Sequence, residues 1–291
     1  MAQSARACEI CGGGLRPWSM RGPRDLFRCD GCGHLLREVG EGPRGARGHP
    51  WGGSLGFDGV RLALTMRRLD RLFLRGGPAP SVLDIGFGSG ALLRRLMDRG
   101  CAVAGVEKGM LGVAVDPVVR ERARLFWGGI EDAAIPEGAF DLVLGIHLIE
   151  HVDDVRAFAR ACFRALRPGG RLYVLTPSAD SAGLALFGGA WWNLEDPSHV
   201  RFFSAASVRR LLESEGFLRV RTASPAWDSV MVEVNSLWRW LGVGSGQHGV
   251  LSRGWVRALD LAALPCAMVA RMLYRRLASS LEVIAEKGGG P

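Results

Sequence analysis

The sequence predicts an α/β fold with a doubly wound, mostly parallel sheet. Short apolar runs rich in β-branched residues alternate with amphipathic helical runs through the middle of the chain. The first of these apolar runs ends in an acid and a glycine-rich turn, at residues 82–90, directly before a helical run. The 291 residues, 48% of them hydrophobic, leave room for one such domain of about 200 residues with appendages.

The predicted elements follow one another from residue 58. Apolar and β-branched runs predict strands over 82–85, 102–106, 124–127, 140–146, 171–176 and 217–222. Leucines at helical spacing and capping signals predict helices over 58–75, 90–99, 153–166 and 205–215. Strand and helix therefore alternate, which is the order of a βαβ sheet.

The glycine-rich turn at 82–90 is compatible with two cofactors. Gly86, Gly88 and Ala91 satisfy a dinucleotide fingerprint, which indicates NAD(P). Asp84, two residues before the first glycine, instead favours a ligand that carries a cation, such as the amino group of S-adenosylmethionine (SAM). The turn by itself leaves both cofactors open.

A second acid, Glu107, ends the next predicted strand, 23 residues after Asp84. A carboxylate at this position can accept hydrogen bonds from both hydroxyls of a ribose. Acids at strand ends also cap helices, but the neighbouring glycine turn makes ribose binding the favoured interpretation.

Four of the seven cysteines lie within the first 32 residues, as two Cys-x-x-Cys pairs. The pairs are Cys8 with Cys11 and Cys29 with Cys32, and 17 residues separate them. Each pair can present two thiolates to one ion, so the four predict a closed, structural Zn site. Two disulfides and four free thiols are the alternatives. His34 is expected to be a surface residue.

The remaining cysteines, Cys101, Cys162 and Cys266, are scattered and are expected to be buried apolar groups. This cysteine usage suits a reducing cytoplasm. The first residues show no signal-peptide pattern, and no run of about 18 apolar residues predicts a spanning helix. The expected location is the cytoplasm, with the inner face of the membrane as an alternative.

The net charge of +8 suggests an anionic partner. Lys108 and Lys287 are the only lysines, however, so nearly all of the positive charge is arginine. Such a bias is typical of a GC-rich genome. The charge balance therefore does not favour a dedicated nucleic-acid surface.

Four motifs follow one another between residues 81 and 224. They are D-I-G-F-G-S-G from Asp84, V-E ending at Glu107, F-D-L-V-L-G-I-H-L-I-E-H-V from Phe140, and L-R-P-G-G-R-L-Y-V-L-T-P from Leu166. In order and spacing this region resembles the seven-stranded class I SAM-dependent methyltransferases, closest to the ubiquinone/menaquinone-type and sugar or natural-product subgroup. The R-P-G-G turn is not expected in a dinucleotide-binding enzyme. The chain also lacks the Tyr-x-x-x-Lys motif of short-chain dehydrogenases.

The resemblance implies a Rossmann-like methyltransferase fold and a set of SAM-binding residues. The methionine end of SAM would be shaped by Asp84, Gly86, Phe87, Gly88 and Gly90. Glu107 would hold the ribose, Ile130 and Glu131 would contact the adenine, and His147 would line the methyl-transfer cleft. The chain departs from the family at residues 128–129, where Gly-Gly stands in place of a frequent Gly-Asp.

A histidine cluster follows the fourth predicted strand. His147, Glu150 and His151 are spaced to share one face of a helical turn, and His199 lies in the long loop after the fifth strand. Ubiquinone O-methyltransferases and small-RNA 2′-O-methyltransferases hold a divalent metal with E-x-x-E-H and a later His. This chain reads H-x-x-E-H, so we favour His199 or His147 as a general base. A divalent metal and a structural role for His151 are the alternatives.

The last strand of the resembled fold fits residues 280–286, which leaves an insertion of about 55 residues before it. The insertion is rich in Trp, Leu and Arg, the composition of an interfacial membrane segment. It predicts a lid over the acceptor, a dimer face, or peripheral membrane contact through residues 229–276. Pro265 and the internal charges exclude a clean transmembrane span.

The sequence thus predicts a zinc-ribbon-like module, a linker, a SAM-dependent methyltransferase core, a helical insertion and a last core strand. The corresponding ranges are 1–40, 41–57, 58–223, 224–279 and 280–288. The expected reaction is methylation of a hydroxyl on a small molecule, a glycan or a lipid-linked intermediate. An RNA methyltransferase that uses the zinc ribbon to bind its substrate, and a non-catalytic SAM-fold partner protein, are the alternatives. No oligomeric state follows from the sequence.

Overall fold

The computed structural model describes residues 7–18, 25–38, 55–109, 114–243 and 254–289. Contacts divide the chain into two compact units, each assembled from separate stretches of sequence. The first unit comprises Met1–Gly45, Thr176–Leu211 and Thr222–Glu282. The second comprises Ala46–Leu175, Leu212–Arg221 and Val283–Pro291. The predicted core range, 58–223, therefore contributes to both units.

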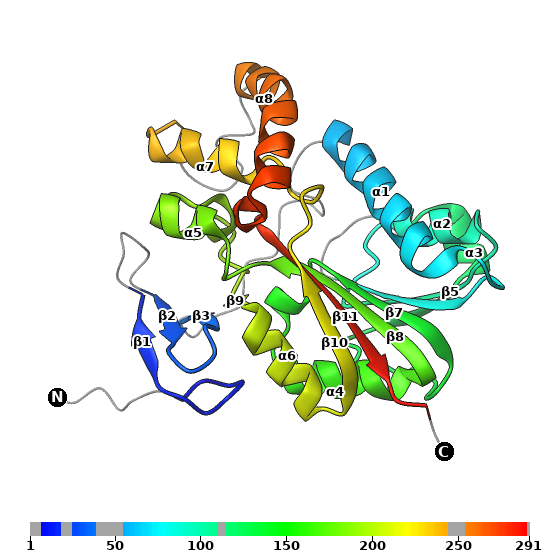
Figure 1. Cartoon of the computed structure of the whole chain (residues 1–291). Helices are drawn as coiled ribbons and strands as arrows, with labels where there is room; N and C mark the ends of the chain where they lie inside the picture. Colours follow the sequence, from blue (N-terminus) through cyan, green and yellow to red (C-terminus); the bar gives the residue numbers. More distant parts are fainter. Residues whose placement is uncertain (1–6, 19–24, 39–54, 110–113, 244–253, 290–291) are drawn as a thin grey trace. The chain divides into compact units, whose positions relative to one another are not determined.

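A seven-stranded sheet is the centre of the second unit (Figure 1). Its strands are β4 (Ser81–Ile85), β5 (Ala102–Glu107), β6 (Arg124–Trp127), β7 (Phe140–Ile146), β8 (Leu166–Pro177), β10 (Phe217–Ala223) and β11 (Ser280–Lys287). They stand in the order β10-β11-β8-β7-β4-β5-β6. The pairs β8/β7, β7/β4, β4/β5 and β5/β6 run parallel. The predicted doubly wound, mostly parallel sheet is confirmed.

The strand order reverses at β4. The chain passes from β4 to β5 and β6 on one side, and then crosses to β7 and β8 on the other. In an open α/β sheet such a reversal leaves a crevice at the carboxyl ends of the strands, where ligands bind. The fold therefore places the residues that follow β4 and β7 beside a ready-made binding crevice.

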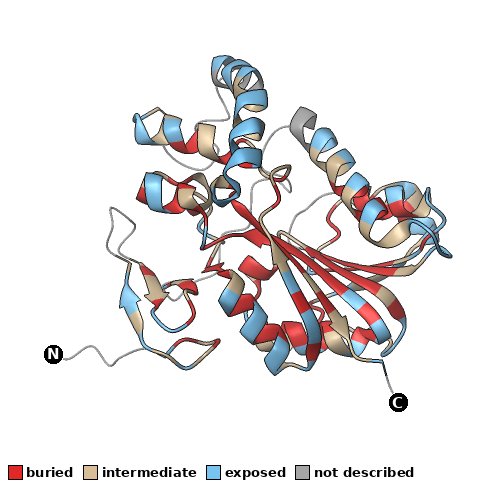
Figure 2. Cartoon of the chain, viewed as in Figure 1, coloured by how far each residue is buried: buried red, intermediate tan, exposed pale blue. Residues whose placement is uncertain are grey.

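Strand β8 begins earlier than the sequence predicts. Leu166 already pairs with Phe140, and the register then shifts before Arg171 pairs with Leu142. Residues 167–170, predicted as a turn before the strand, form the irregular section within it. Figure 2 shows the inner strands of this sheet almost wholly buried, as expected of parallel strands covered on both faces.

Five helices belong wholly or partly to the second unit: α1 (Leu55–Leu69), α2 (Ala91–Met97), α3 (Pro117–Arg122), α4 (Val155–Ala165) and α6 (Ala205–Ser214). Helix α1 continues as one π-helical turn, Asp70–Leu74. Asp154 begins α4 by accepting hydrogen bonds from the backbone N–H groups of Arg156 and Ala157. Helices α1 and α2 lie on one face of the sheet and α4 on the other (Figure 1).

The first unit contains a small antiparallel sheet. Its strands are β1 (Leu15–Pro17), β2 (Leu26–Cys29), β3 (Leu35–Arg37) and β9 (Arg201–Phe202), in the order β1-β2-β3-β9. Three strands come from the N-terminal cysteine region, and the fourth lies more than 160 residues later. The sequence did not predict that these two regions share a sheet.

Three further helices belong to the first unit: α5 (Ala182–Phe187), α7 (Val232–Trp240) and α8 (Gly254–Leu273). Helices α7 and α8 form the predicted helical insertion between the last two core strands. Helix α8 continues through Pro265 as one element. Among the helices described, none is both long enough and apolar enough to cross a membrane.

Candidate active site

A pocket opens in the second unit at the carboxyl ends of β4 and β7, where the strand order reverses. Helix α1 supplies one wall, and the glycine turn after β4 supplies another. The lining residues are Arg61, Leu62, Thr65, Asp84, Gly86, Leu92 and Ile146. Arg61 brings a guanidinium and Asp84 a carboxyl group to an otherwise largely apolar crevice. Such a pocket suits a ligand that carries both an ammonium and a carboxylate group.

Asp84 is the buried acid of this pocket, with only 4% of its surface exposed. Burial, and after it the nearby charge of Glu107, raises the pKa of Asp84 to about 8. A cation placed beside the Asp84 carboxyl would reverse this shift, because it favours the ionised form. The environment of Asp84 is therefore chemically suited to the predicted partner, a ligand ammonium.

Glu107, at the end of β5, holds the glycine turn. Its Oε2 accepts a hydrogen bond of 2.9 Å from the backbone N–H of Gly88, and the side chain is buried. One oxygen of the carboxylate thus fixes the turn, and a carboxylate has further lone pairs for ligand hydroxyls. This geometry is compatible with the predicted contact to a ribose.

Gly86 is the point where the turn must stay free of a side chain. Its φ of +76° belongs to the left-handed region, and a Cβ atom here would lie 2.9 Å from Cδ1 of Leu148. Phe87, predicted to help shape the cofactor site, is almost completely buried and is absent from the pocket lining. Its ring meets that of Trp127 edge to face, 5.7 Å between centroids. Phe87 therefore supports the turn from within the core.

The predicted adenine contacts lie beyond β6. Ile130 is buried, whereas Glu131 is partly exposed and pairs with Lys108, Oε1 to Nζ 3.4 Å. A Cβ atom on Gly129 would overlap the Glu131 carboxylate. The Gly-Gly at 128–129 thus leaves room for this position of the Glu131 carboxylate, which would have to shift if residue 129 carried the frequent family aspartate.

Three residues predicted as a cluster do meet around one carboxyl group. Glu150 is completely buried in a 3-10 turn after β7, with its Oε1 3.5 Å from Nδ1 of His147 and 3.9 Å from Nε2 of His151. His147 directly follows Ile146 of the pocket lining. Its φ of +51° is uncommon for a residue other than glycine, and its N–H donates to the Leu175 carbonyl at 2.6 Å. Backbone strain of this kind is often found at functional sites.

His199, the fourth predicted catalytic residue, belongs to the first unit. Its Nδ1 lies 2.7 Å from the carbonyl oxygen of Asn193, and its Nε2 lies 3.8 Å from Oδ2 of Asp196. With a donor hydrogen on Nδ1, the Asn193 contact fixes the neutral tautomer in which Nε2 is the basic nitrogen.

The four N-terminal cysteines gather at one point. Their sulfur atoms lie within 4.8 Å of one another, with Cys8 and Cys32 3.7 Å apart and Cys11 and Cys29 3.4 Å apart. Four thiolates around a tetrahedral Zn²⁺, at about 2.3 Å each, would be about 3.8 Å apart. A disulfide needs about 2.05 Å. The donor set and spacing fit zinc, and they do not fit the two disulfides considered as an alternative.

Two expectations about this region and its cysteines are wrong. His34 is completely buried and its Nε2 lies 2.9 Å from Oε1 of Glu9, so it is not a surface residue. Cys266 is exposed on α8, whereas Cys101 and Cys162 are buried as expected. His34 is buried because distant parts of the chain contact it, whereas Cys266 is exposed because such contacts do not cover it on α8. The local sequence does not reveal contacts of this kind.

Arg61 and Thr65 of the pocket were missed by sequence reasoning. The helix that carries them was predicted, but no residue of this helix was placed at the cofactor site. The available signal was their spacing of four residues, which puts both side chains on one helix face. Choosing that face required knowledge of where α1 meets the sheet.

Comparisons with known proteins agree with this geometry. A family model described as "Methyltransferase domain" matches residues 59–221. The malonyl-[acyl-carrier protein] O-methyltransferase of Serratia marcescens is 30% identical over 205 residues, 65% of this chain and 75% of that protein. The ubiquinone biosynthesis O-methyltransferase of Paramagnetospirillum magneticum is 33% identical over 123 residues. This match covers 39% of the present chain and 49% of the relative, so the chain spans only about half of that relative's length.

A solved structure shares the fold. Phosphoethanolamine N-methyltransferase 2 of Haemonchus contortus, in complex with SAM, superposes with a TM-score of 0.53 at 16% identity, covering 78% of this chain and 53% of that one. The family model alone covers more than half of the chain. The chain therefore belongs to the methyltransferase-domain family and is a SAM-dependent methyltransferase.

Proposed function

We propose that the enzyme methylates a hydroxyl group of a small-molecule acceptor. The observation that carries this proposal is the buried Glu150 carboxyl group between His147 and His151. His147 directly follows Ile146, the pocket-lining end of β7. A histidine held by a buried carboxylate is a general base, which a hydroxyl acceptor requires because it is a poor nucleophile. The O-methyltransferase relatives support the same reaction class.

The pocket residues would orient SAM by the two charged groups on the α-carbon of its methionine moiety. The Arg61 guanidinium suits the α-carboxylate and the Asp84 carboxyl suits the α-ammonium, since both side chains line one crevice. Glu107 would bind the ribose hydroxyls, with Ile130 and Glu131 at the adenine. The backbone of Gly86, free of a Cβ, allows the ligand to approach the turn closely.

SAM supplies an electrophilic methyl group. In the reaction the acceptor oxygen forms a bond to the methyl carbon, the carbon–sulfur bond breaks, and its electron pair stays on the sulfur of the leaving S-adenosylhomocysteine. His147 accepts the hydroxyl proton at Nε2, while Glu150 faces Nδ1 and stabilises the resulting imidazolium. His199 is the alternative base, with Nε2 again the basic atom.

The four cysteines would hold one structural Zn²⁺. All four positions are protein ligands, so this site offers no open coordination position for catalysis. A separate divalent metal at the histidine cluster is a competing proposal, and chelation tests it because the cysteine site and the histidine site can be followed separately.

An exposed apolar surface supports an acceptor presented at a membrane. Nine of the thirteen exposed large hydrophobic residues described lie on α7 and α8 or directly after one of these helices: Leu237, Trp240, Leu241, Trp255, Leu259, Val269, Met272, Leu273 and Tyr274. Figure 2 shows exposure along α8. The exposed charged side chains described on this segment are Arg275 and Arg276, directly after the helix. Aromatic and aliphatic side chains bordered by arginines match the interface of an anionic bilayer.

The membrane contact is tested with vesicles. The protein should co-sediment with vesicles containing a third phosphatidylglycerol, and Leu273→Asp with Met272→Asp should reduce binding at least tenfold. Leu218→Asp, an exposed apolar residue on β10, is the matched control and should bind as the unchanged protein does. Equal binding of all variants, or a dimer in solution that dissociates in the α8 variant, would contradict membrane docking.

The reaction is tested with tritiated SAM and a cell extract divided into RNA, lipid and soluble small-molecule pools. Label should appear in the small-molecule or lipid pool and be released by the chemistry expected of a methyl ether. Label confined to RNA would favour the RNA methyltransferase alternative. Failure to bind SAM in calorimetry would favour a non-catalytic partner protein.

A further inference from the structure

The cysteine module, by which we mean the N-terminal region with the four cysteines and strands β1, β2 and β3, shares one sheet with the segment that carries His199. Strand β3 pairs with β9 in antiparallel register, Leu35 opposite Phe202 and Leu36 opposite Arg201. The N–H of Arg37 continues the ladder by donating to the Val200 carbonyl at 2.8 Å. Strand β3 therefore has β9 on one edge and β2 on the other, which leaves the module incomplete without residues 200–202.

A partly buried ion pair joins the turn between Cys8 and Cys11 to β9. Glu9 lies between Cys8 and Cys11, and its two carboxylate oxygens accept from Nε and Nη2 of Arg201 at 2.7 and 2.9 Å. Nε2 of His34 also lies 2.9 Å from Oε1 of the same carboxylate. A bidentate pair of this kind fixes both distance and angle between its two elements.

Arg37 reaches further into the His199 segment. Its Nη1 donates to the Asp196 carbonyl at 2.8 Å and its Nη2 to the Leu194 carbonyl at 2.9 Å, and the side chain is buried. These carbonyls belong to the turn that runs from Asn193, whose own carbonyl contacts Nδ1 of His199. Arg37 thus holds the turn that orients the imidazole.

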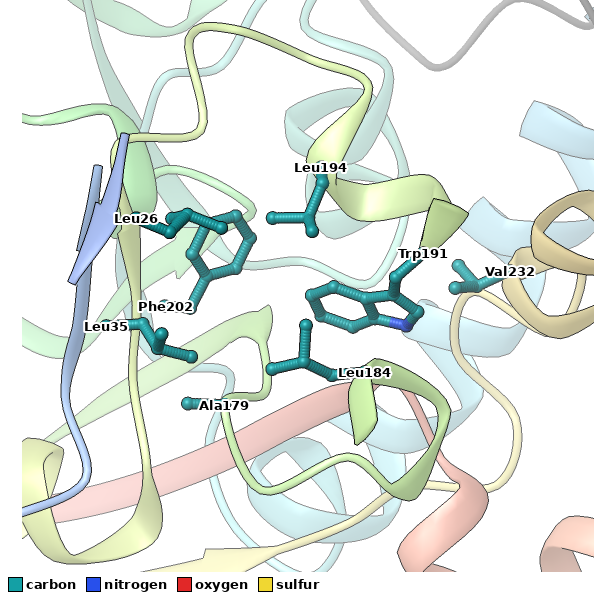
Figure 3. Packing of buried hydrophobic residues seen from close by; sticks show 8 residues of the cluster. All are labelled: Leu26, Leu35, Ala179, Leu184, Trp191, Leu194, Phe202 and Val232. Carbon is teal, nitrogen blue, oxygen red and sulfur yellow. The ribbon is translucent and has the colours of Figure 1, made fainter. Parts of the chain in front are cut away.

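Apolar packing also links the cysteine module to residues 191–204. Leu26 and Leu35 of the module share one buried cluster with Trp191, Leu194 and Phe202 of the later segment (Figure 3). The hydroxyl of Ser204 also donates to the carbonyl of Cys32, one of the four cysteines. Four kinds of contact therefore connect the region of the four cysteines to residues 191–204. They are the β3–β9 pairing, the Glu9–Arg201 ion pair, the hydrogen bonds of Arg37 and the apolar packing.

We propose that the cysteine module is a positioning element for the acceptor side of the reaction: metal bound to the four cysteines orders residues 191–204 and thereby orients His199. SAM binding is independent of this device, because Arg61, Asp84, Gly86 and Glu107 belong to the other unit. The assignment of His199 to the acceptor side rests on the proposed function, whereas the coupling itself does not.

The test compares three substitutions in the full-length protein with its zinc content verified. Arg37→Ala removes the contacts to the turn, and Arg37→Lys keeps the charge but loses the fork that reaches both carbonyls. Arg16→Ala is the matched control, because Arg16 belongs to the same module but forms an exposed pair with Asp30. The readouts are amide hydrogen exchange over residues 191–204, the Kd for SAM, and methyl transfer into the acceptor pool with its pH profile.

Arg37→Ala should speed exchange over 191–204 at least tenfold and lower transfer at least tenfold, while the Kd for SAM stays within twofold. Arg37→Lys should restore part of both losses, and Arg16→Ala should change nothing. Stripping the metal from the unchanged protein should reproduce the Arg37→Ala pattern. Unchanged exchange in Arg37→Ala, or a SAM Kd that rises in step with exchange, would overturn the coupling. If exchange responds but no acceptor pool is ever labelled, the coupling stands and the proposed function fails.

Discussion

Nδ1 of His147 lies 3.5 Å from Oε1 of Glu150, a carboxyl group with no exposed surface. The histidine follows the last residue of β7, and Ile146 of that strand lines the pocket. Because the Glu150 carboxyl group faces Nδ1 of His147, the other ring nitrogen, Nε2, is the one left to accept a proton. The relationship joins the pocket to the proton acceptor that we propose.

Replacing His147 by Gln should lower methyl transfer by about 10²–10⁴-fold, the usual contribution of a general base. The Kd for SAM should stay within about threefold. Glu150→Gln should lower transfer less, since it leaves the imidazole but removes the charge that favours its protonation. Glu137→Gln, an exposed acid, is the control. If His147→Gln keeps more than a tenth of the activity while His199→Gln loses it, the base is His199.

Binding of SAM should release protons. Without ligand the pKa of Asp84 is about 8, so its carboxyl is mostly protonated at pH 7, and a bound ammonium favours the ionised form. SAM affinity should therefore rise as the pH increases from 6 towards 8, by at most tenfold per unit, and level off above. Calorimetry in buffers of different ionisation enthalpy measures the released proton. Asp84→Asn should bind weakly and without this pH dependence; an equal dependence in the variant would exclude Asp84 as its source.

Arg61→Ala should weaken both SAM and S-adenosylhomocysteine, because both ligands carry the α-carboxylate that Arg61 is proposed to bind. Loss of one charged hydrogen bond of about 1.5–3 kcal/mol corresponds to roughly a 10–150-fold rise in Kd. The matched control is Arg67→Ala, an exposed residue six positions further along α1. Binding of 5′-methylthioadenosine, which has no carboxylate, should be unchanged in Arg61→Ala, and an equal loss would argue for a general collapse of the pocket.

Metal analysis should find one zinc per chain in the unchanged protein and none in Cys11→Ser with Cys29→Ser. Brief treatment with EDTA, too short to remove the cysteine-bound zinc, should leave methyl transfer unchanged. Activity that disappears under these conditions and returns with Mg²⁺ or Mn²⁺ would instead establish a catalytic metal at the histidine cluster.

The sequence was most informative where local pattern alone decides structure. The run from Val82 to Met97 forms strand, turn and helix because β-branched residues, positive-φ glycines and leucines at helical spacing all agree. The cluster of His147, Glu150 and His151 was also predictable, since residues three and four apart in a tight turn meet without help from distant segments.

The rest depended on pairings between distant stretches of chain. Nothing at Leu35 or Phe202 signals that these residues face one another across a sheet. The burial of His34 follows from that pairing, and the role of Arg61 follows from where α1 meets β4. Periodicity identifies which face of a helix or strand is apolar, but it does not identify the element that packs against that face.

The β3–β9 pairing also sets an order of assembly during synthesis. The cysteines leave the ribosome first, yet the strand that completes their sheet emerges about 165 residues afterwards. At translation rates of about 5–20 residues per second, this interval is roughly 10–30 s. During that time β3 has an open edge, and the Glu9 carboxylate lacks its arginine. A nascent chain can thus bring the four cysteines together early but can complete their sheet only after most of the methyltransferase core has been made, so the N-terminal region alone lacks one of the four strands of this sheet.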